Sequence, residues 1–288
     1  MSHSESADIS VRVYSPEPLL GHPLTLIKNM SLDLWAGREL AWRLFVRDLS
    51  AQYRQTYLGY IWAFLPPVVA SVTFIFLNSQ GIVKIDTGGI PYPAFAMMGT
   101  LLWQVFVDAM ISPSQSLLAA KSMLSKINFP REAVLMGGLC MVVFNFLVRL
   151  VLVAAVMLVW NVVPTVSILM FPVAMAALLA AGFAIGLCLA PFAGLYGDVT
   201  RAIPMVAQFW MLLTPVVYPA RTQGLAGVLA TWNPISPLIT SAREALTGQD
   251  LTHLPAFFIV FSVALLLCFV GLVGFRLAMP HLIARMGG

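Results

Sequence analysis

The chain has 288 residues, of which 60% are hydrophobic and only 10% are charged, and its mean hydropathy is +0.89. Soluble domains carry about 25% charged residues, so this composition excludes a string of soluble domains and indicates one membrane domain. The net charge of +4 does not indicate nucleic-acid binding, because the basic residues are spread over short segments that flank apolar runs.

The chain begins with a polar segment, residues 1–30, for which we expect a cytoplasmic location. It carries Glu5, Asp8 and Glu17 and lacks an early apolar core, so we expect no signal peptide here.

An amphipathic helix is predicted over residues 31–54. Its polar stripe repeats at helical spacing and comprises Glu39, Arg43, Arg47, Ser50 and Arg54. Its apolar face comprises Trp35, Trp42, Phe45, Val46 and Leu49. Such a pattern favours a helix lying in the membrane interface, where tryptophan is enriched. The alternative is a helix packed against another protein domain.

Residues 58–279 form the predicted membrane domain, an all-α bundle with six transmembrane helices. The apolar segments are about 58–80, 94–118, 133–160, 166–190, 202–220 and 254–275, and about 20 apolar residues suffice to cross a bilayer. Between the last two, the apolar pieces of residues 219–253 are too short to span. We predict two short re-entrant or interfacial helices there, on the outer face and interrupted at Asn233-Pro234.

The distribution of positive charge predicts the orientation. Of the 16 lysines and arginines, Lys84, Arg221 and Arg243 fall on one side of the predicted spans, and Arg149 falls within a span. All the others fall in the N-terminal segment, the second and fourth loops and the tail. By the positive-inside rule both termini are cytoplasmic, as an even number of spans requires.

Sequence motifs for catalysis and metal binding are absent. The sequence has no phosphate-binding loop of the G-x-x-x-x-G-K-[ST] type and no H-E-x-x-H motif. Its cysteines, Cys140, Cys188 and Cys268, each lie in an apolar run. We therefore expect no catalytic residue, no metal site and no cofactor bound by this chain.

Two charged residues, Asp108 and Arg149, lie inside predicted spans. A charge in lipid is costly unless it is paired or faces water. The two form either a structural ion pair between neighbouring helices or part of a polar pathway. Gly182 and Gly186 form a small-x-x-x-small pair, which lets helix backbones approach closely, either within one chain or between two.

Several motifs together resemble one family, the permease subunits of type-2 ABC exporters for polysaccharides. The similarity covers about residues 35 to 280, and the motifs occur in the same order and at similar spacing. The motifs are residues 47–49 with 53–62, Pro66-Pro67, Tyr92-Pro93 with Gly99 and Trp103, 126–132, 197–199, 214–218, and Asn233-Pro234 followed by 243–246. The chain departs from the family pattern at Gly197, because the resemblance implies a basic residue at this position, just before Asp198.

The resemblance implies a homodimeric permease that works with two copies of a separate ATPase subunit, which would bind ATP and Mg²⁺. It implies export of a lipid-linked polysaccharide across the bacterial inner membrane, with O antigen as the first candidate cargo. It also implies that the first and fifth spans line the pathway, with Tyr57, Tyr60, Phe64, Phe209, Trp210 and Tyr218 as candidate lining residues. Each of these aromatic side chains has an alternative place, against lipid or another helix.

The loop from residue 119 to residue 131 is the candidate for receiving motion from the ATPase. The residues concerned are Lys121, Met123, Leu124, Lys126, Phe129, Pro130 and Arg131. A short amphipathic helix would seat Met123, Leu124 and Phe129 in a groove of the ATPase. The alternative is a basic turn that only sets topology.

Rival functions remain open at this stage. A related permease for capsular polysaccharide, teichoic acid or a drug would look much the same. An ion-coupled secondary transporter needs a membrane-embedded acidic site, and only Asp108 is available. A membrane glycosyltransferase or ligase needs catalytic groups in an outer loop, which offers only Asp86, Glu244 and Asp250.

Overall fold

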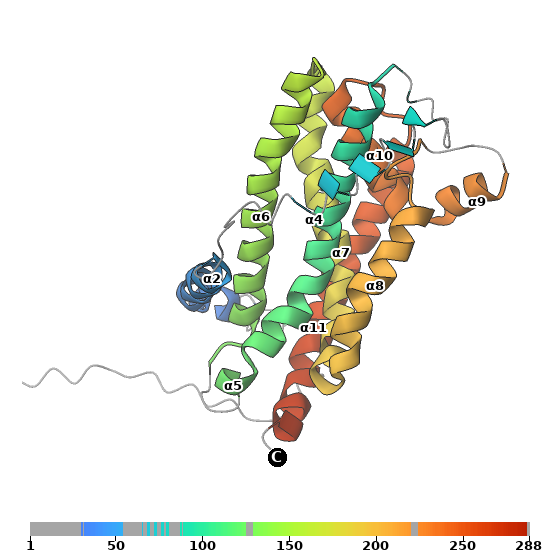
Figure 1. The fold of residues 1–288 in the computed structure, drawn as a ribbon. Helices are drawn as coiled ribbons and strands as arrows, with labels where there is room; N and C mark the ends of the chain where they lie inside the picture. Colours follow the sequence, from blue (N-terminus) through green and yellow to red (C-terminus); the bar gives the residue numbers. More distant parts are fainter. Residues whose placement is uncertain are drawn as a thin grey trace, which may run out of the picture.

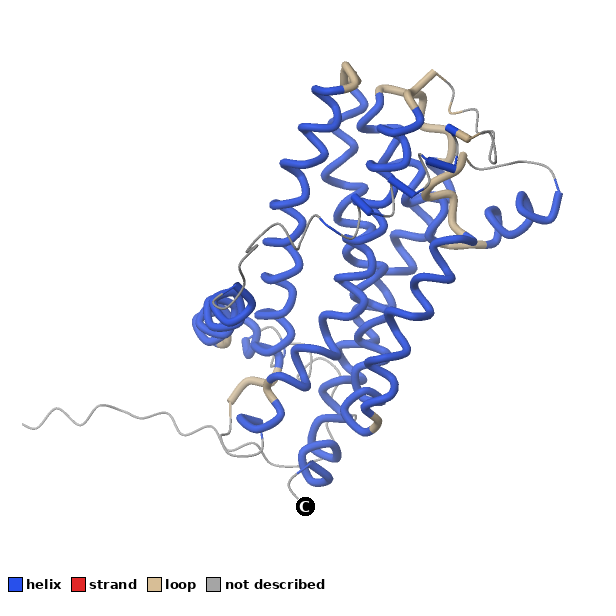
Figure 2. The backbone as a smooth tube through the Cα atoms, in the orientation of Figure 1, coloured by secondary structure: helices blue, strands red, loops and turns tan. Residues whose placement is uncertain are grey.

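The structure is a computed structural model that describes residues 30, 32–53, scattered positions from 65 to 80, 87, 89–124, 129–219 and 224–286. All regular elements in these ranges are helical (Figure 2). The predicted span 58–80 falls largely outside the described residues. So do Arg54, Tyr57, Tyr60, Phe64 and Lys126.

Four long helices run side by side and form the body of the molecule (Figure 1). They are α4 (Tyr92–Ala119), α6 (Glu132–Val159), α7 (Phe171–Leu195) and α11 (Leu254–Met286), and the short 3₁₀ helix η2 (Val166–Met170) leads directly into α7. Their length and composition suffice to cross a membrane. Four of the predicted apolar helices are thereby confirmed.

Helix α8 (Gly197–Leu213) differs from the prediction of a helix over 202–220. It begins earlier and ends at Leu213, because Pro215 disfavours helical backbone at the preceding residue. Thr214 accordingly adopts an extended ψ of 140°. At about 1.5 Å per residue, α8 is shorter than the roughly 30 Å hydrocarbon core of a bilayer. The predicted boundaries of the fifth span were therefore wrong.

Two short helices follow, α9 (Gly224–Trp232) and α10 (Ile235–Thr247), and the interruption at Asn233-Pro234 is the one predicted. Helix α10 ends at Gly248, whose φ of 71° is left-handed and suits glycine at a helix C-terminus. Every side chain from Ile235 to Leu246 except Pro237 is buried. Helix α10 therefore packs inside the bundle, against α7 and α11, and does not lie on its surface.

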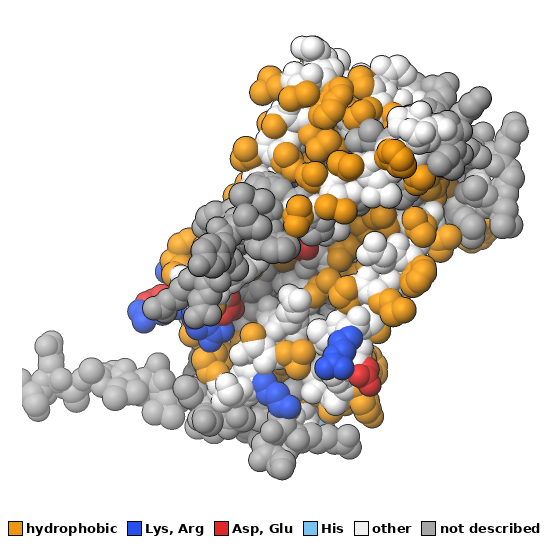
Figure 3. All heavy atoms as spheres, in the orientation of Figure 1, with side chains coloured by type: hydrophobic (Ala, Val, Ile, Leu, Met, Phe, Trp, Pro, Cys, Tyr) orange, Lys and Arg blue, Asp and Glu red, His pale blue; other side chains and the backbone are white. Residues whose placement is uncertain are grey.

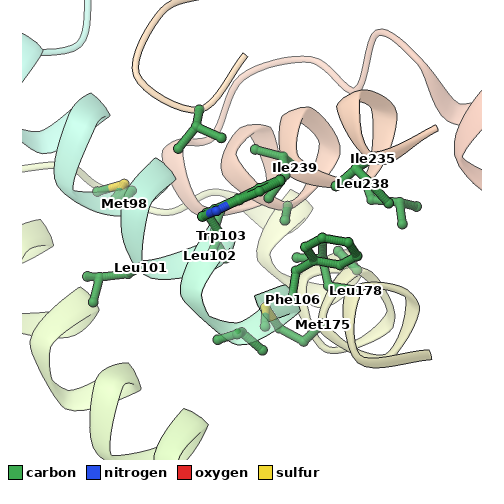
Figure 4. Close-up of a cluster of buried hydrophobic side chains, with 14 of the residues drawn as sticks. Met98, Leu101, Leu102, Trp103, Phe106, Met175, Leu178, Ile235, Leu238 and Ile239 are labelled. Carbon is green, nitrogen blue, oxygen red and sulfur yellow. The ribbon is translucent and has the colours of Figure 1, made fainter. Parts of the chain in front are cut away.

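The main core lies where α4, α7 and α10 meet (Figure 4). Its largest fully buried side chains include Trp103 and Phe106 of α4, Leu178 of α7 and Leu238 of α10. Tight contact between α4 and α7 depends on glycine. A Cβ at Gly182 would lie 2.4 Å from the carbonyl oxygen of Phe106, and one at Gly186 would lie 2.3 Å from that of Met110. The glycine pair therefore packs within one chain.

A second core cluster lies at the opposite end of the bundle, near the four-residue helix α5 (Lys121–Leu124). It joins side chains from six helices, including Leu44, Leu117, Leu124, Leu135, Leu187 and Phe275. Leu44 belongs to α2 (Arg38–Tyr53), which is seen almost end-on beside α6, roughly perpendicular to the long helices (Figure 1). Helix α2 is thus fixed to the bundle through one of its faces.

The outer surface of the bundle is strongly apolar (Figure 3). Large side chains stand exposed on α6, α8 and α11, among them Val151, Leu158, Phe209 and Ile259. Charged side chains visible in Figure 3 gather towards the α5 end. An apolar surface this extensive is typical of helices that face lipid.

Candidate functional site

Helix α5 and the residues around it form the segment for which the sequence predicted contact with an ATPase. Lys121 is exposed, whereas Leu124 is buried in the second core cluster. Met123 and Phe129 are partly buried against the same cluster. The expectation that Leu124 is offered to a groove on a partner was therefore wrong. The apolar residues anchor this segment to its own bundle, and Lys121 remains on the surface.

The segment ends where α6 begins. Pro130 and Arg131 are half-buried, and Arg131 occupies the position just before the first residue of α6, Glu132. Glu132 is buried and accepts a hydrogen bond from Arg276 of α11. Because the segment is continuous with α6, a displacement of the segment would also move the first residues of α6.

The two charges inside predicted spans form a direct contact. Arg149 Nη1 of α6 donates to Asp108 Oδ2 of α4 over 2.6 Å. The arginine side chain is 9% exposed and the aspartate side chain 22%. Pairing removes the isolated charge that would be costly in lipid. The geometry corresponds to the structural alternative, an ion pair that joins two neighbouring helices.

Trp210, one of the predicted pathway aromatics, occupies a packed position at the end of α8. Its ring meets Trp103 and Phe106 edge-on, at centroid distances of 6.2 and 5.5 Å. Its Nε1 donates to Asn233 Oδ1 over 3.2 Å, and Asn233 Nδ2 donates to Thr214 Oγ1 over 2.8 Å. Trp210 therefore ties α8 to the start of α10 and does not face outward.

The other described aromatics of this span are more open. Phe209 is 61% exposed on the outer side of α8. Tyr218 is half-buried, and its hydroxyl donates to the carbonyl oxygen of Leu212 over 2.8 Å. Of the three, Phe209 offers the most accessible ring.

Arg243 was assigned by charge counting to an outer loop, but it is a buried residue of α10, only 3% exposed. Its Nη1 and Nη2 donate to the carbonyl oxygens of Val216 and Pro215 over 3.0 and 3.1 Å. Its guanidinium carbon lies 3.7 Å from the ring centroid of Phe95 on α4. This side chain fastens the extended segment after α8 to α4. The spacing of Ile235, Ile239 and Arg243, which places the arginine on an apolar helical stripe, could have revealed it.

Glu244, next in the chain, also has a structural role. Its carboxylate accepts hydrogen bonds from the backbone N–H and the hydroxyl of Thr252, at 3.1 and 2.6 Å. This closes the loop that leads to α11. A transferase site would need several convergent polar groups; among the described residues, Glu244 is committed to this loop, and no cluster of three metal-binding side chains occurs there.

Helix α2 has two differently exposed sides, which corrects the prediction of a single apolar face. Phe45 is buried and packs near Phe144 of α6, with ring centroids 6.1 Å apart. Trp42 is 60% exposed, and Trp35, in the helical turns before α2, is 70% exposed. Helix α2 packs against α6 on the side of Phe45, so Trp42 and Trp35 remain exposed on the surface.

The predicted polar stripe of α2 is largely exposed. Arg43 pairs with Glu39 over 2.7 Å, and Arg47 pairs with Asp48 over 2.7 Å. Exposed tryptophans and paired surface charges share this element, a combination that suits the boundary between lipid and water.

Comparison with known proteins agrees with this architecture. Residues 39–247 match the family described as ABC-2 type transporter. The chain is similar to the O-antigen export system permease protein RfbA of Myxococcus xanthus, with 26% identity over 217 residues, 73% of this chain and 80% of the relative. It is also similar to two proteins of the same name from Klebsiella pneumoniae, at 22% and 21% identity over 80% and 78% of this chain.

The family match begins in α2 and ends with α10, so it includes the α5 segment, the Asp108–Arg149 pair and the buried Arg243. It covers well over half of the sequence, and three permeases align over most of their own length. The chain belongs to the ABC-2 type transporter family.

Proposed function

We propose that this chain is the membrane permease subunit of an ATP-driven exporter. The exporter moves a lipid-linked polysaccharide out of the cytoplasm across the inner membrane, and O antigen is the first candidate cargo. The observation that carries the proposal is its similarity to three O-antigen export permeases over 73–80% of its length. The chain is a transport subunit and not an enzyme, so ATP and Mg²⁺ are bound by a partner. Both termini face the cytoplasm.

The partner we propose is a nucleotide-binding ATPase present in two copies, serving a homodimer of this chain. Contact would be made by the α5 segment, with Lys121, Lys126 and Arg131 supplying positive charge. The burial of Leu124 among residues of α4, α6, α7 and α11 supports this role. A segment that packs against several helices can transmit its displacement to all of them.

The pathway for the sugar chain would run beside α8 and the segment before residue 80. A polysaccharide presents hydroxyls and apolar ring faces, and conduction requires weak contacts repeated along the route. The exposed ring of Phe209 is suited to such a contact. Tyr57, Tyr60 and Phe64 would contribute from the first span, and Tyr218 from the end of the fifth.

Helix α2 would lie at the cytoplasmic surface of the membrane and contact lipids. Its near-perpendicular course to the long helices (Figure 1) is the orientation of an interfacial helix. The exposed Trp35 and Trp42 would sit at headgroup depth, where tryptophan is enriched.

The ion-coupled alternative is less well supported. It requires a membrane-embedded carboxylate free to bind a proton or Na⁺. Asp108 is already bonded to Arg149 at 2.6 Å, so it is not the free carboxylate that such a site requires. Export of capsular polysaccharide, teichoic acid or a drug would use the same parts, and only the cargo would differ.

One experiment tests both the class and the cargo. The detergent-solubilised chain, carrying a terminal tag, is purified from its native cells, and the gene is separately deleted. We expect an ATPase subunit to co-purify and the deletion strain to retain lipid-linked O-antigen polymer inside while losing it from the surface. Normal surface O antigen in the deletion strain would reject this cargo, and transport that persists without ATP would reject the class.

A second test addresses the α5 segment. Charge reversal by Lys121→Glu together with Lys126→Glu is expected to weaken ATPase assembly and export. Full assembly and export by the reversed variant would leave the segment with a topological role only.

A further inference from the structure

A buried group of three charges joins elements that lie far apart in the sequence. Arg276 Nη2 of α11 donates to Asp33 Oδ2 over 2.6 Å, and Arg276 Nη1 donates to Glu132 Oε1 over 2.9 Å. The side chains are 12%, 3% and 7% exposed, in the order Arg276, Asp33, Glu132. One guanidinium thus bridges two carboxylates that are 99 positions apart, using both of its terminal nitrogens.

The three residues come from three different elements at the α5 end of the bundle. Asp33 lies in the helical turns before α2, Glu132 is the first residue of α6, and Arg276 lies in the last part of α11. Figure 1 shows α5 and the end of α11 at the bottom of the molecule, with α2 beside the lower part of α6. The second core cluster, which includes Leu124 and Phe275, packs in the same region.

The electrostatics make the arginine essential to the arrangement. Two carboxylates are withdrawn from water and Arg276 contacts both of them, so loss of this cation would remove a counter-charge that the two share. The planar guanidinium presents its N–H donors as a fixed fork, which fits two acceptors at once better than an ammonium group does. The position of Glu132 at the N-terminus of α6 also favours its negative charge.

We propose that Arg276 is a positioning residue for energy coupling. It fixes the start of α6, and with it the end of the α5 segment, to the helical turns before α2 and to α11. A displacement imposed on the α5 segment is then transmitted to α2 and α11 together, instead of being absorbed by local movement of α6. This inference rests on the proposed function, in which the α5 segment receives motion from an ATPase.

The geometry allows each link to be cut separately. Asp33→Asn weakens the ionic link to the turns before α2, and Glu132→Gln weakens the ionic link to α6. The triple variant Asp33→Asn/Glu132→Gln/Arg276→Met removes all three charges and preserves approximate side-chain size. Replacing an entire buried ionic group is commonly tolerated, whereas removing one partner is not, so the triple variant separates a loss of coupling from a loss of folding.

The readouts are assembly with the ATPase, ATP hydrolysis and polysaccharide export by the complete transporter in membranes. In the triple variant we expect normal assembly and hydrolysis, with export per ATP hydrolysed reduced about five-fold or more, the lower range of coupling between sites. Arg43→Met is the matched control, because it breaks an ion pair on the exposed side of α2, where both side chains are more than 70% exposed. Its export should equal that of the unchanged protein.

Arg276→Lys gives a result even if the triple variant does not assemble. The lysine retains the positive charge but cannot reproduce the two-pronged contact, so it should also export less per ATP. Unchanged export per ATP in either assembled variant would overturn the inference. Failure of the unchanged chain to assemble with an ATPase would instead overturn the proposed function, so the two failures are distinguishable.

Discussion

Arg149 of α6 and Asp108 of α4 lie 41 positions apart in the sequence and make a hydrogen-bonded ion pair of 2.6 Å. The pair joins two helices that are long and apolar enough to span a membrane. Neither charge could remain there alone at low cost. The pair therefore stabilises the packing of α4 against α6, and its net charge of zero leaves no isolated ion at this position.

Removing either partner should destabilise the protein. Asp108→Asn leaves Arg149 buried without its counter-ion, and Arg149→Leu does the same to Asp108; breaking such a pair costs about 3–5 kcal/mol. The double variant Asp108→Asn/Arg149→Leu removes both charges and should recover most of the folded yield and of the export. Size-exclusion yield in detergent and O-antigen export are the measurements. A double variant that folds normally but fails to export would assign these residues to the pathway.

The contact between α7 and α4 should be intolerant of any side chain at Gly186. A Cβ there would lie 2.3 Å from the carbonyl oxygen of Met110 and 2.9 Å from Cδ of Pro113. The overpacking caused by Gly186→Ala should cost about 1–3 kcal/mol. Alanine regains roughly 1 kcal/mol through its higher helix propensity, so we expect a net loss of stability. The thermal midpoint of the detergent-purified protein should fall.

Gly274→Ala is the matched control for this glycine. It lies in the helix α11, and a Cβ there meets no atom within 4 Å, so the same substitution should keep or raise the thermal midpoint. Equal midpoints for the two variants would show that α4 and α7 are not in close backbone contact.

Arg243 should be needed for the position of the segment that follows α8. Arg243→Met would leave the carbonyl oxygens of Pro215 and Val216 buried without this donor, at about 1–3 kcal/mol for each, and would remove the contact with the ring of Phe95. Arg243→Lys should not restore stability, because a single ammonium group does not match the two-pronged arrangement. Thermal midpoints measure both effects.

Arg201→Met serves as the control for Arg243, since Arg201 is an exposed arginine on α8. Its thermal midpoint should change little. If Arg243→Met were equally well tolerated, the buried arginine would not hold the 214–218 segment in place.

The long helices could be predicted because an apolar run of about 20 residues crosses lipid as a helix, which satisfies its backbone hydrogen bonds within the segment. The break between α9 and α10 could be predicted because Pro234 cannot continue a helix from Asn233. The end of α8 was misjudged because the apolar Val216 and Val217 obscured the effect of Pro215 on Thr214. In that stretch, local backbone restriction outweighed hydrophobicity.

The site was harder to predict than the fold, because its residues are defined by long-range contacts. Charge counting assumes that an arginine outside a span is exposed, and Arg243 violates that assumption through bonds to residues 215 and 216. The bonds of Arg276 to Asp33 and Glu132 bridge 243 and 144 positions. No local pattern reports such distant partners. The pattern of α2 likewise gives an apolar face but not which part of it packs against α6.

Phe209 and Trp210 are adjacent in α8 but should respond differently to truncation. Trp210 packs against both Trp103 and Phe106 and bonds to Asn233, so Trp210→Ala should cost about 3–5 kcal/mol of stability and lower the folded yield. Phe209 is 61% exposed, so Phe209→Ala should fold normally. If its ring contacts the sugar chain with about 1 kcal/mol, export should slow roughly five-fold at unchanged protein level. Phe269→Ala, an exposed aromatic on α11, should export normally; equal export by the Phe209 and Phe269 variants would remove Phe209 from the pathway.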